Sequence, residues 1–426
     1  MKKSLPSLAR PSAAAFVTQA MASSVIAAVS FGHLLNDMMQ SLLLSIYPIL
    51  KSSYALSFAQ LGWLTLAYQL TASLLQPVAG WYADRRAVPY SLPAGTLFTA
   101  TGVMILAIGH AYALLLIGAC LLGVGSSVFH PESSRVTRLA AGDQPGLAQS
   151  LFQVGGNAGS ALGPLCAAIV VTRWGQRSLL AFAAVTLLSA VALWHVGGWY
   201  KHRLAMKPRA VVVGSAPAGG LSRRLRVRGI WILLVLIFSK YAYTATLTSY
   251  YTFYLIDRFH LSLSEAQVRL FVFLAALACG TLLGGPLGDR FGRDRVIRFS
   301  VFGALPLTLL LPYANLYWNG PLTVAIGLVM AASFPAIVVF GQELLPGRVG
   351  TVSGLLFGFA FGAASLSAAL MGRVADAVGV GPVYAIGAFL PLLGAVTLFL
   401  PNPEAGPEHG VSRRVSAFAT SRRVSK

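Results

Sequence analysis

Long apolar runs, separated by short polar breaks, recur along this 426-residue chain. There are about 12 of them, each of roughly 20 residues, which is the length of a helix that crosses the hydrocarbon core of a bilayer. Because 56% of the residues are hydrophobic, 10% are charged and the mean hydropathy is +0.71, a water-soluble fold could not bury this apolar surface. The sequence therefore predicts an all-α membrane protein with about 12 transmembrane helices, centred near residues 37, 70, 102, 122, 158, 185, 244, 277, 305, 329, 361 and 390.

The formal net charge of +20 is explained by topology rather than by nucleic-acid binding. If the amino terminus is cytoplasmic, 25 of the 32 Lys and Arg residues fall in the tails and cytoplasmic loops. Two more, Lys240 and Arg269, lie within predicted helices. This asymmetry follows the positive-inside rule and places both termini in the cytoplasm of a bacterial cell, below its cytoplasmic (inner) membrane. The five exceptions are Lys51, Arg173, Arg177, Arg258 and Arg373.

The longest polar stretch between apolar runs divides the chain into two groups of six predicted helices. Segments 146–175 and 350–379 both begin and end with glycine at equal spacing, about 204 residues apart. Parallel repeats of this kind place a substrate near the bilayer midplane, between two halves that rock to expose it to one side at a time. We predict an N-terminal six-helix bundle (1–198), a cytoplasmic linker (199–229), a C-terminal six-helix bundle (230–401) and a basic cytoplasmic tail (402–426).

A glycine-rich charged turn joins two apolar runs in each half. Gly284 to Arg295 reads GGPLGDRFGRDR, and about 205 residues earlier Gly80 to Arg85 reads GWYADR. This pattern resembles the short cytoplasmic loop motif of the major facilitator superfamily. The resemblance implies a 12-helix transporter built from two pseudo-symmetric six-helix bundles.

The turns are interpreted as a conformational lock. A carboxylate in such a turn can accept N–H groups of a helix N-terminus and pair with a nearby arginine, and these contacts must break when the access state changes. The first copy has Ala87 and Val88 where glycine and arginine are expected, so we predict a weaker lock there. A solvated charge cluster is the alternative. The predicted lock residues are Asp84, Arg85, Gly285, Asp289, Arg290, Gly292 and Arg293.

One polar stripe interrupts the first apolar run. Its members recur at helical spacing, so they share one face of a helix: His33, Asn36, Asp37, Gln40 and Ser41. An ionisable group near the midplane is costly unless it faces a wet cavity or a partner. We therefore predict that Asp37, with His33, carries the coupling proton. A structural pairing with a neighbouring helix is the alternative.

Lys240 lies at a similar depth in the seventh apolar run, so the two halves place opposite charges near equivalent positions. A buried anion needs a cation nearby, which makes Lys240 the predicted anion site. A Lys240–Asp37 salt bridge without a ligand role is the alternative, and the two ideas are compatible. The predicted substrate-binding residues are Lys240, Asn36, Gln153, Asn157, Tyr243 and Tyr251. Interhelical hydrogen bonds and an aromatic helix interface are the simpler roles for the last four.

A further polar group ends the fourth and tenth apolar runs on the cytoplasmic side. Glu132 and Arg135 are three residues apart and can pair on one helix face. We predict a cytoplasmic gate, with a helix-end ion pair as the alternative, formed by His130, Glu132, Arg135, Gln342 and Glu343.

Glycines recur every fourth residue at Gly155, Gly159 and Gly163, followed by Pro164. The spacing predicts a smooth helix face that allows close helix packing. A similar series at 354, 358 and 362 is expected to repeat this face in the second half. The string GSALGP from Gly159 to Pro164 resembles the helix-five motif of superfamily antiporters, which favours export over uptake.

More specific strings narrow the resemblance: SFGHLLNDMMQSLLLSIYP, GSSVFHPESSRV, AQSLFQVGGN, FSKYAY and QELLPGR. From about Phe31 to Pro401 they resemble the fosmidomycin-resistance exporters, a branch of the superfamily. The resemblance implies proton-driven export of a small anionic phosphonate by a protein of the bacterial cytoplasmic membrane.

The expected partners are therefore a small anion, protons and lipid, for a protein expected to be monomeric. The three cysteines have no metal-ligand spacing, and no nucleophile constellation is recognisable, so we expect no cofactor, metal or enzymatic activity. The remaining alternatives are an uptake symporter for an organic anion and, with less support, an intramembrane lipid-modifying enzyme.

Overall fold

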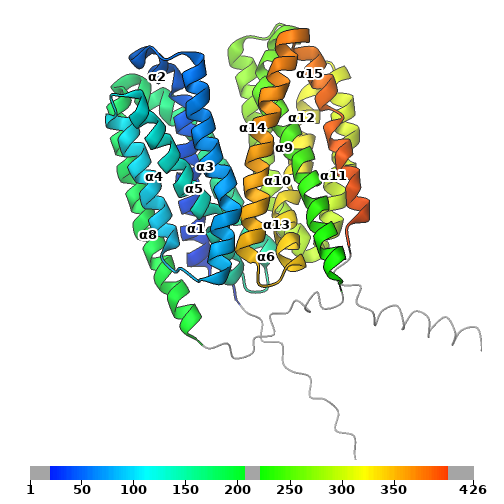
Figure 1. Cartoon of the computed structure of the whole chain (residues 1–426). Helices are drawn as coiled ribbons and strands as arrows, with labels where there is room; N and C mark the ends of the chain where they lie inside the picture. The colour runs from blue at the N-terminus through cyan, green and yellow to red at the C-terminus, as the bar shows by residue number, and fades with distance from the viewer. Residues whose placement is uncertain (1–19, 207–220, 402–426) are drawn as a thin grey trace, which may run out of the picture.

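The computed structural model describes residues 20–206 and 221–401, and all regular secondary structure in these ranges is helical (Figure 1). The predicted tail 402–426 and the middle of the predicted linker lie outside the described residues. The N-terminal half consists of α1 (Ser23–Ser45), α2 (Tyr47–Tyr54), α3 (Phe58–Arg85), α4 (Ser91–Ile108), α5 (Tyr112–Ala140), α6 (Pro145–Cys166), η1 (Ala167–Val171), α7 (Thr172–Trp174), η2 (Gln176–Ser178) and α8 (Leu179–Ala205).

The C-terminal half repeats this order of long helices. It consists of α9 (Arg223–Phe259), α10 (Leu263–Phe291), α11 (Arg293–Leu310), η3 (Leu311–Tyr313), α12 (Leu316–Ala331), α13 (Ser333–Leu344), α14 (Val349–Val378), α15 (Val380–Gly387) and η4 (Leu390–Phe399). Equivalent helices even begin in the same way. Ser57 with Gln60 and Ser262 with Glu265 form capping boxes at the starts of α3 and α10, which satisfies backbone N–H groups that a helix start leaves free.

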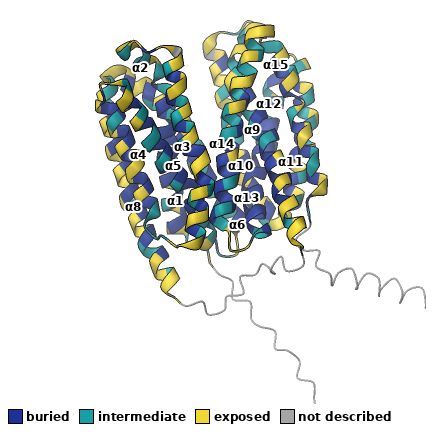
Figure 2. Ribbon diagram, in the orientation of Figure 1, coloured by how far each residue is buried: buried dark blue, intermediate teal, exposed yellow. Residues whose placement is uncertain are grey.

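The predicted 12 transmembrane helices are confirmed. In the described ranges, ten helical spans are long and apolar enough to cross a membrane by length and composition alone. Five of these spans join consecutive helical segments: α6 with η1 and α7, η2 with α8, α11 with η3, α12 with α13, and α15 with η4. The other two crossings are α1 and α3, whose polar residues face the protein interior, as described below. Many exposed residues lie on the outside of the helices (Figure 2), and the exposed residues include large apolar side chains such as Leu74 and Trp231.

The two halves are joined at one end of the molecule and separate toward the other (Figure 1). One buried cluster combines residues of α1, α5, α6 and α8 with residues of α9, α11, α13 and α14, so it crosses between the halves. The two remaining clusters each stay within one half. We call the joined end, where α3 ends at Arg85 and α10 ends at Phe291, the closed end.

The glycine series of α6 packs against α1, as the close-packing prediction requires. A Cβ on Gly155 would lie 2.2 Å from the carbonyl oxygen of Ser30, and one on Gly159 would lie 2.0 Å from that of Leu34. Any side chain at these positions would push the two helices apart.

The second glycine series also provides a close-packed helix face, as expected, at Gly354 and Gly358, but its partner helix lies in the other half. Gly354 and Gly358 of α14 pack across the halves onto α3, where a Cβ would lie 2.2 Å from the Gln76 carbonyl oxygen and 2.4 Å from that of Ser73. A Cβ on Gly362 would meet nothing within 4 Å. The reason is register: with the repeat offset of about 204 residues, Gly354 corresponds to Ser150 and not to Gly155. The series therefore serves contact between the halves.

Candidate functional site

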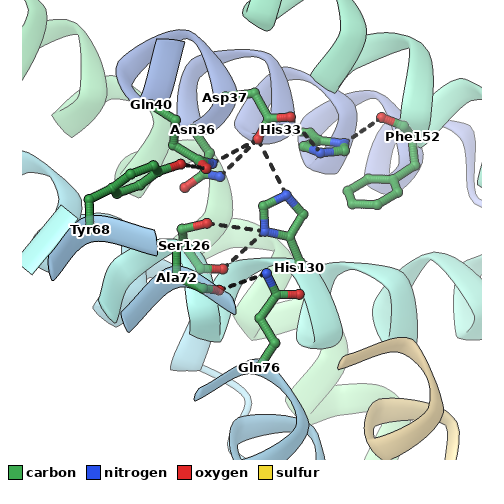
Figure 3. A network of polar contacts seen from close by, with 10 residues as sticks. All are labelled: His33, Asn36, Asp37, Gln40, Tyr68, Ala72, Gln76, Ser126, His130 and Phe152. Atoms are coloured by element: carbon green, nitrogen blue, oxygen red, sulfur yellow. Dashed lines mark hydrogen bonds and ion pairs between the residues drawn. The ribbon is translucent and has the colours of Figure 1, made fainter. Parts of the chain in front are cut away.

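Polar side chains of the predicted stripe on α1 converge on Asp37 (Figure 3). The Oδ1 atom of Asp37 accepts hydrogen bonds from Asn36 Nδ2 at 3.1 Å and Gln40 Nε2 at 3.0 Å. Gln40 also accepts a hydrogen bond from the hydroxyl of Tyr68 on α3. Ser41, by contrast, donates at 3.3 Å to a carbonyl of its own helix. All members except Ser41 are buried, so the stripe faces the interior of the N-terminal half.

Two histidines complete the cluster around Asp37. His33 Nε2 lies 3.3 Å from Asp37 Oδ2, and His130 Nε2 lies 3.3 Å from Asp37 Oδ1. The other ring nitrogen is held by backbone: His33 Nδ1 donates to the Phe152 carbonyl at 2.7 Å, and His130 Nδ1 donates to the Ser126 carbonyl at 3.0 Å. Both histidines are at most 1% exposed. We call His33, Asp37 and His130 the Asp37 cluster.

The sequence predicts His130 in the gate, and the structure places it in the Asp37 cluster instead. Residues two apart on a helix point in different directions, so His130 and Glu132 do not share a face of α5. Glu132 turns toward Arg135, with 3.6 Å between Oε2 and Nη1. The pairing of α5 with α1 across nearly 100 residues has no local sequence signal.

Gly156 of α6 is a site residue that the sequence analysis did not single out. A Cβ at this position would lie 2.5 Å from His33 Nε2 and 2.8 Å from Asp37 Oδ2. The lack of a side chain on Gly156 therefore makes the space in which the cluster forms. The available signal was that Gly156 follows Gly155 in the series that packs against α1.

The Asp37 cluster is also the group of described residues whose geometry could admit a metal ion. The ligand atoms of its three members lie within 4.8 Å of one another, and all three side chains are buried. However, Asp37 already accepts two amide hydrogen bonds, and both Nε2–oxygen distances suit a hydrogen bond through one proton. The arrangement can therefore hold protons with no further ligand.

Lys240 is buried in the C-terminal half without a carboxylate partner among the described residues. Its Nζ donates to the hydroxyl of Ser333 on α13, which also accepts a hydrogen bond at 3.0 Å from Ser300 on α11. The alternative of a Lys240–Asp37 salt bridge is therefore not realised in this structure. Lys240 is 6% exposed, and its hydrogen-bond partner among the described residues is the single hydroxyl of Ser333.

The other predicted substrate residues are distributed differently. Tyr251 donates to Asn319 at 2.6 Å inside the C-terminal half, and the buried hydroxyl of Tyr243 has no hydrogen-bond partner among the described residues. Asn157 donates to the Thr281 hydroxyl at 3.2 Å across the two halves, which is the interhelical role that was its alternative. Asn36 binds Asp37, and the side-chain oxygen of Gln153 is buried without a partner in the described ranges.

Asp289 forms the predicted contact with a helix N-terminus, and it does so across the halves. Its Oδ1 and Oδ2 accept the backbone N–H groups of Gly146 and Leu147, at the start of α6, both at 2.9 Å. Arg293 adds a third bond to Oδ1 at 3.1 Å. The carboxylate therefore meets both the free N–H groups and the positive end of the α6 dipole.

Asp84 makes the same contact in the opposite direction. It accepts the backbone N–H groups of Gly350 and Thr351, at the start of α14, at 2.8 and 2.7 Å. The expectation of a weaker first copy does not fit this geometry. Val88 does remove the arginine that stands four residues after Asp289, but the Thr351 hydroxyl donates to Asp84 at 2.6 Å in its place.

The remaining motif residues have separate roles. Gly285 lies against Gly146, where a Cβ would meet the carbonyl oxygen at 2.0 Å, and Gly80 lies against Gly350 at the same distance. Gly292 adopts φ 95°, which only glycine adopts readily, at the turn between α10 and α11. The arginines that follow the two aspartates do not pair with them: each guanidinium lies over an aromatic ring, Arg85 over Trp81 and Arg290 over Phe291.

The predicted gate residues other than His130 lie at the closed end, and two of them connect the halves. Gln342 donates to Ser134 of α5 at 3.1 Å and to Ser353 of α14 at 3.0 Å. Glu343 lies 2.7 Å from Arg293 and 3.7 Å from Arg138, a residue of the other half that the prediction omitted. Glu132 and Arg135 do not take part in these contacts across the halves.

Comparisons with known proteins agree with this architecture. The family model described as Major Facilitator Superfamily matches residues 29–368 and 259–422. The chain is 52% identical over 92% of its length to the fosmidomycin resistance protein of Escherichia coli, of which 96% is covered. It is 38% identical over 89% of its length to the uncharacterized MFS-type transporter YfnC of Bacillus subtilis, of which 93% is covered.

Solved structures show the same fold. The transporter FucP in the outward conformation matches with a TM-score of 0.70 at 17% identity, covering 88% of this chain and 98% of that one. The human organic anion transporter MFSD10 matches with a TM-score of 0.68 at 17% identity, covering 90% and 100%. With two six-helix halves joined by reciprocal aspartate–helix contacts, this chain is a multi-pass membrane transporter, not an enzyme, and belongs to the major facilitator superfamily.

Proposed function

We propose that this protein exports a small anionic phosphonate, with fosmidomycin as the first candidate, in exchange for protons that enter the cell. The observation that carries the proposal is the division of charge between the halves. The C-terminal half holds a buried cation, Lys240, whose hydrogen-bond partner in the described ranges is the Ser333 hydroxyl, and the N-terminal half holds a carboxylate between two histidines. The 52% identical fosmidomycin resistance protein supports the choice of substrate.

The orientation of the protein in the membrane is inferred from topology. Basic residues in the last turns of α8 and the first turn of α9, such as Lys201 and Arg224, lie at the closed end of the molecule. The positive-inside rule therefore makes the closed end cytoplasmic. The structure then corresponds to a state that is closed to the cytoplasm and open outward. We place the monomeric protein in the bacterial cytoplasmic membrane with both termini inside the cell.

The test is transport by purified protein in liposomes. An imposed pH gradient should drive labelled fosmidomycin out of the compartment with the higher pH, against its own gradient, and an ionophore that collapses the gradient should stop it. Accumulation of fosmidomycin in the compartment into which the protons flow would instead favour uptake symport. Flux that ignores the pH gradient would contradict proton coupling.

Replacing Gly156 with alanine should disrupt the Asp37 cluster. The added methyl group would overlap His33 and Asp37, so we expect at least about a tenfold loss of proton-driven export in protein that still inserts. Gly198→Ala is the matched control, because a Cβ there meets nothing within 4 Å. Normal export by the Gly156→Ala protein would show that the cluster tolerates displacement.

The two aspartate locks should be of similar strength. Asp84→Asn and Asp289→Asn each weaken bonds to two backbone N–H groups, a loss of about 1–3 kcal/mol. Each should therefore shift the population toward the cytoplasm-open state by roughly tenfold, because 1.4 kcal/mol is a factor of ten. Labelling of a cysteine at Ser353, buried between the halves, should accelerate to a similar degree in both variants. Faster labelling in Asp289→Asn alone would mean that Asp84, in the first copy of the motif, forms the weaker lock. Asp294→Asn is the control.

A further inference from the structure

The hydrogen bonding of the Asp37 cluster is incomplete when Asp37 is ionised and both histidines are neutral. His33 Nδ1 faces the Phe152 carbonyl, which can only accept, so it carries a hydrogen. His130 Nδ1 lies 3.0 Å from the Ser126 carbonyl and 3.3 Å from the Ser126 hydroxyl; the carbonyl is the nearer partner and can only accept, so this Nδ1 carries a hydrogen as well. Each Nε2 then turns a lone pair toward a carboxylate oxygen 3.3 Å away. Neither Nε2 has a hydrogen-bond partner among the described residues. Two buried acceptors that face each other repel, and each Nε2 is left without a donor.

One proton cannot complete both contacts. A proton between His33 Nε2 and Asp37 Oδ2 satisfies the first contact and leaves His130 Nε2 facing Oδ1. A second proton completes that contact as well, because the two histidines use different oxygens of the carboxylate. The formal charge of the cluster is −1 without these protons and +1 with both, so neither end state buries more than one net charge.

We propose that the Asp37 cluster binds two protons in each transport cycle and that His130 carries one of them. This inference rests on the proton coupling proposed above and adds its stoichiometry and a second carrier. The residues next to His130 in the sequence suggest a role in the gate. Its role as a proton carrier is inferred from its position opposite Asp37 in the folded protein.

No other charged side chain in the described ranges forms an ion pair with Asp37. The titratable groups that face the cluster from other helices are tyrosines: Tyr68 of α3, which reaches it through Gln40, and Tyr241 of α9, which lies close enough to interact electrostatically with Asp37. The rings that α6 and α14 place against the two histidines are phenylalanines. The compensating positive charge for Asp37 therefore comes from protons on the two histidines.

The position of His130 also links proton occupancy to the other half. Its ring lies 5.4 Å from Phe357 and 5.1 Å from Phe361, both on α14, measured between ring centroids. A protonated imidazole is attracted to aromatic faces more strongly than a neutral one. Proton binding at His130 therefore favours the state in which α14 packs against α5, which is the outward-open state of this structure.

The test is the thermodynamic stoichiometry in liposomes with EDTA present and the membrane potential held at zero. At steady state, the logarithm of the fosmidomycin ratio rises with the pH difference with a slope equal to the number of protons exchanged. Protonation of the phosphonate itself affects the slope equally in every variant. A difference in slope between variants therefore measures a difference in the number of protons that the protein exchanges. We expect His130→Gln to lower the slope by one and His195→Gln, an exposed histidine with the same Nδ1–carbonyl bond, to leave it unchanged.

Equal slopes for wild type and His130→Gln would overturn the proposal, whereas a wild-type slope of zero would mean that proton coupling itself fails. If His130→Gln does not transport, nitrogen-15 NMR of histidine-labelled wild type decides. The His130 signal, identified by its loss in the variant, should change from a neutral ring with hydrogen on Nδ1 to an imidazolium as the pH falls. A ring that stays neutral throughout the range of active transport would overturn the proposal.

Discussion

Lys240→Ala is expected to abolish binding of fosmidomycin and resistance to it. A phosphonate that enters the middle of the protein loses most of its hydration and needs a fixed positive charge nearby. In the described part of the chain, Lys240 is a buried cation with no carboxylate to neutralise it, held only by Ser333. We therefore expect Lys240 to be the cation that pairs with the substrate.

The size of this effect follows from the burial. Removing one partner of a buried charge pair costs about 3–5 kcal/mol, so the affinity should fall by at least ~100-fold. Lys240→Arg keeps the charge but replaces a compact ammonium with a planar group, and should retain part of the binding. Ser333→Ala should have a smaller effect, because it removes only the hydroxyl that positions Nζ.

The measurement is equilibrium binding of labelled fosmidomycin to purified protein, together with drug sensitivity of cells. Lys201→Ala removes an exposed lysine at the end of α8 and is the matched control. Thermal unfolding must first show that Lys240→Ala is folded. A folded Lys240→Ala protein with unchanged affinity would make Lys240 a structural residue and place the anion site elsewhere.

The fold was largely predictable because its determinants are local. Each apolar run is an autonomous signal for one transmembrane helix, and the repeat of about 204 residues pairs the halves. The contacts of Asp289 were predictable for the same reason, since carboxylates bind helix N-termini by a general rule. Which helix supplies the N–H groups was not, because α6 and α10 meet only in the assembled protein.

The parts of the site that were missed depend on residues far apart in the chain. Val88 in place of an arginine predicts a weaker role for Asp84, and the compensating hydroxyl belongs to Thr351 in the other half. The neighbouring Glu132 favours a gate role for His130, yet helix geometry turns His130 to α1. Sequence spacing within one helix identifies a face, but it does not identify what that face meets.

Asp37→Asn is expected to retain substrate binding and to lose transport driven by a pH gradient. The introduced amide is nearly isosteric with the carboxylate: its oxygen can accept the bonds from Asn36 and Gln40, and its NH₂ group can donate to the lone pair on His33 Nε2. The variant therefore imitates one protonated contact permanently and cannot release that proton. Its neutral amide oxygen also removes the charge that would hold a proton on His130, so neither proton is exchanged. Substrate exchange without a gradient should continue, because it does not require proton release.

Two assays on the same liposomes separate these functions. Exchange of labelled for unlabelled fosmidomycin at equal pH should stay within a few-fold of wild type, whereas pH-driven accumulation should vanish. Asp294→Asn removes a carboxylate from the first turn of α11, outside the cluster, and should change neither. Full proton-driven accumulation by Asp37→Asn would transfer the coupling role to His33, His130 or Glu132. Loss of exchange as well would mean that the carboxylate is needed to hold α1, α5 and α6 together, since these three helices meet at its two oxygens.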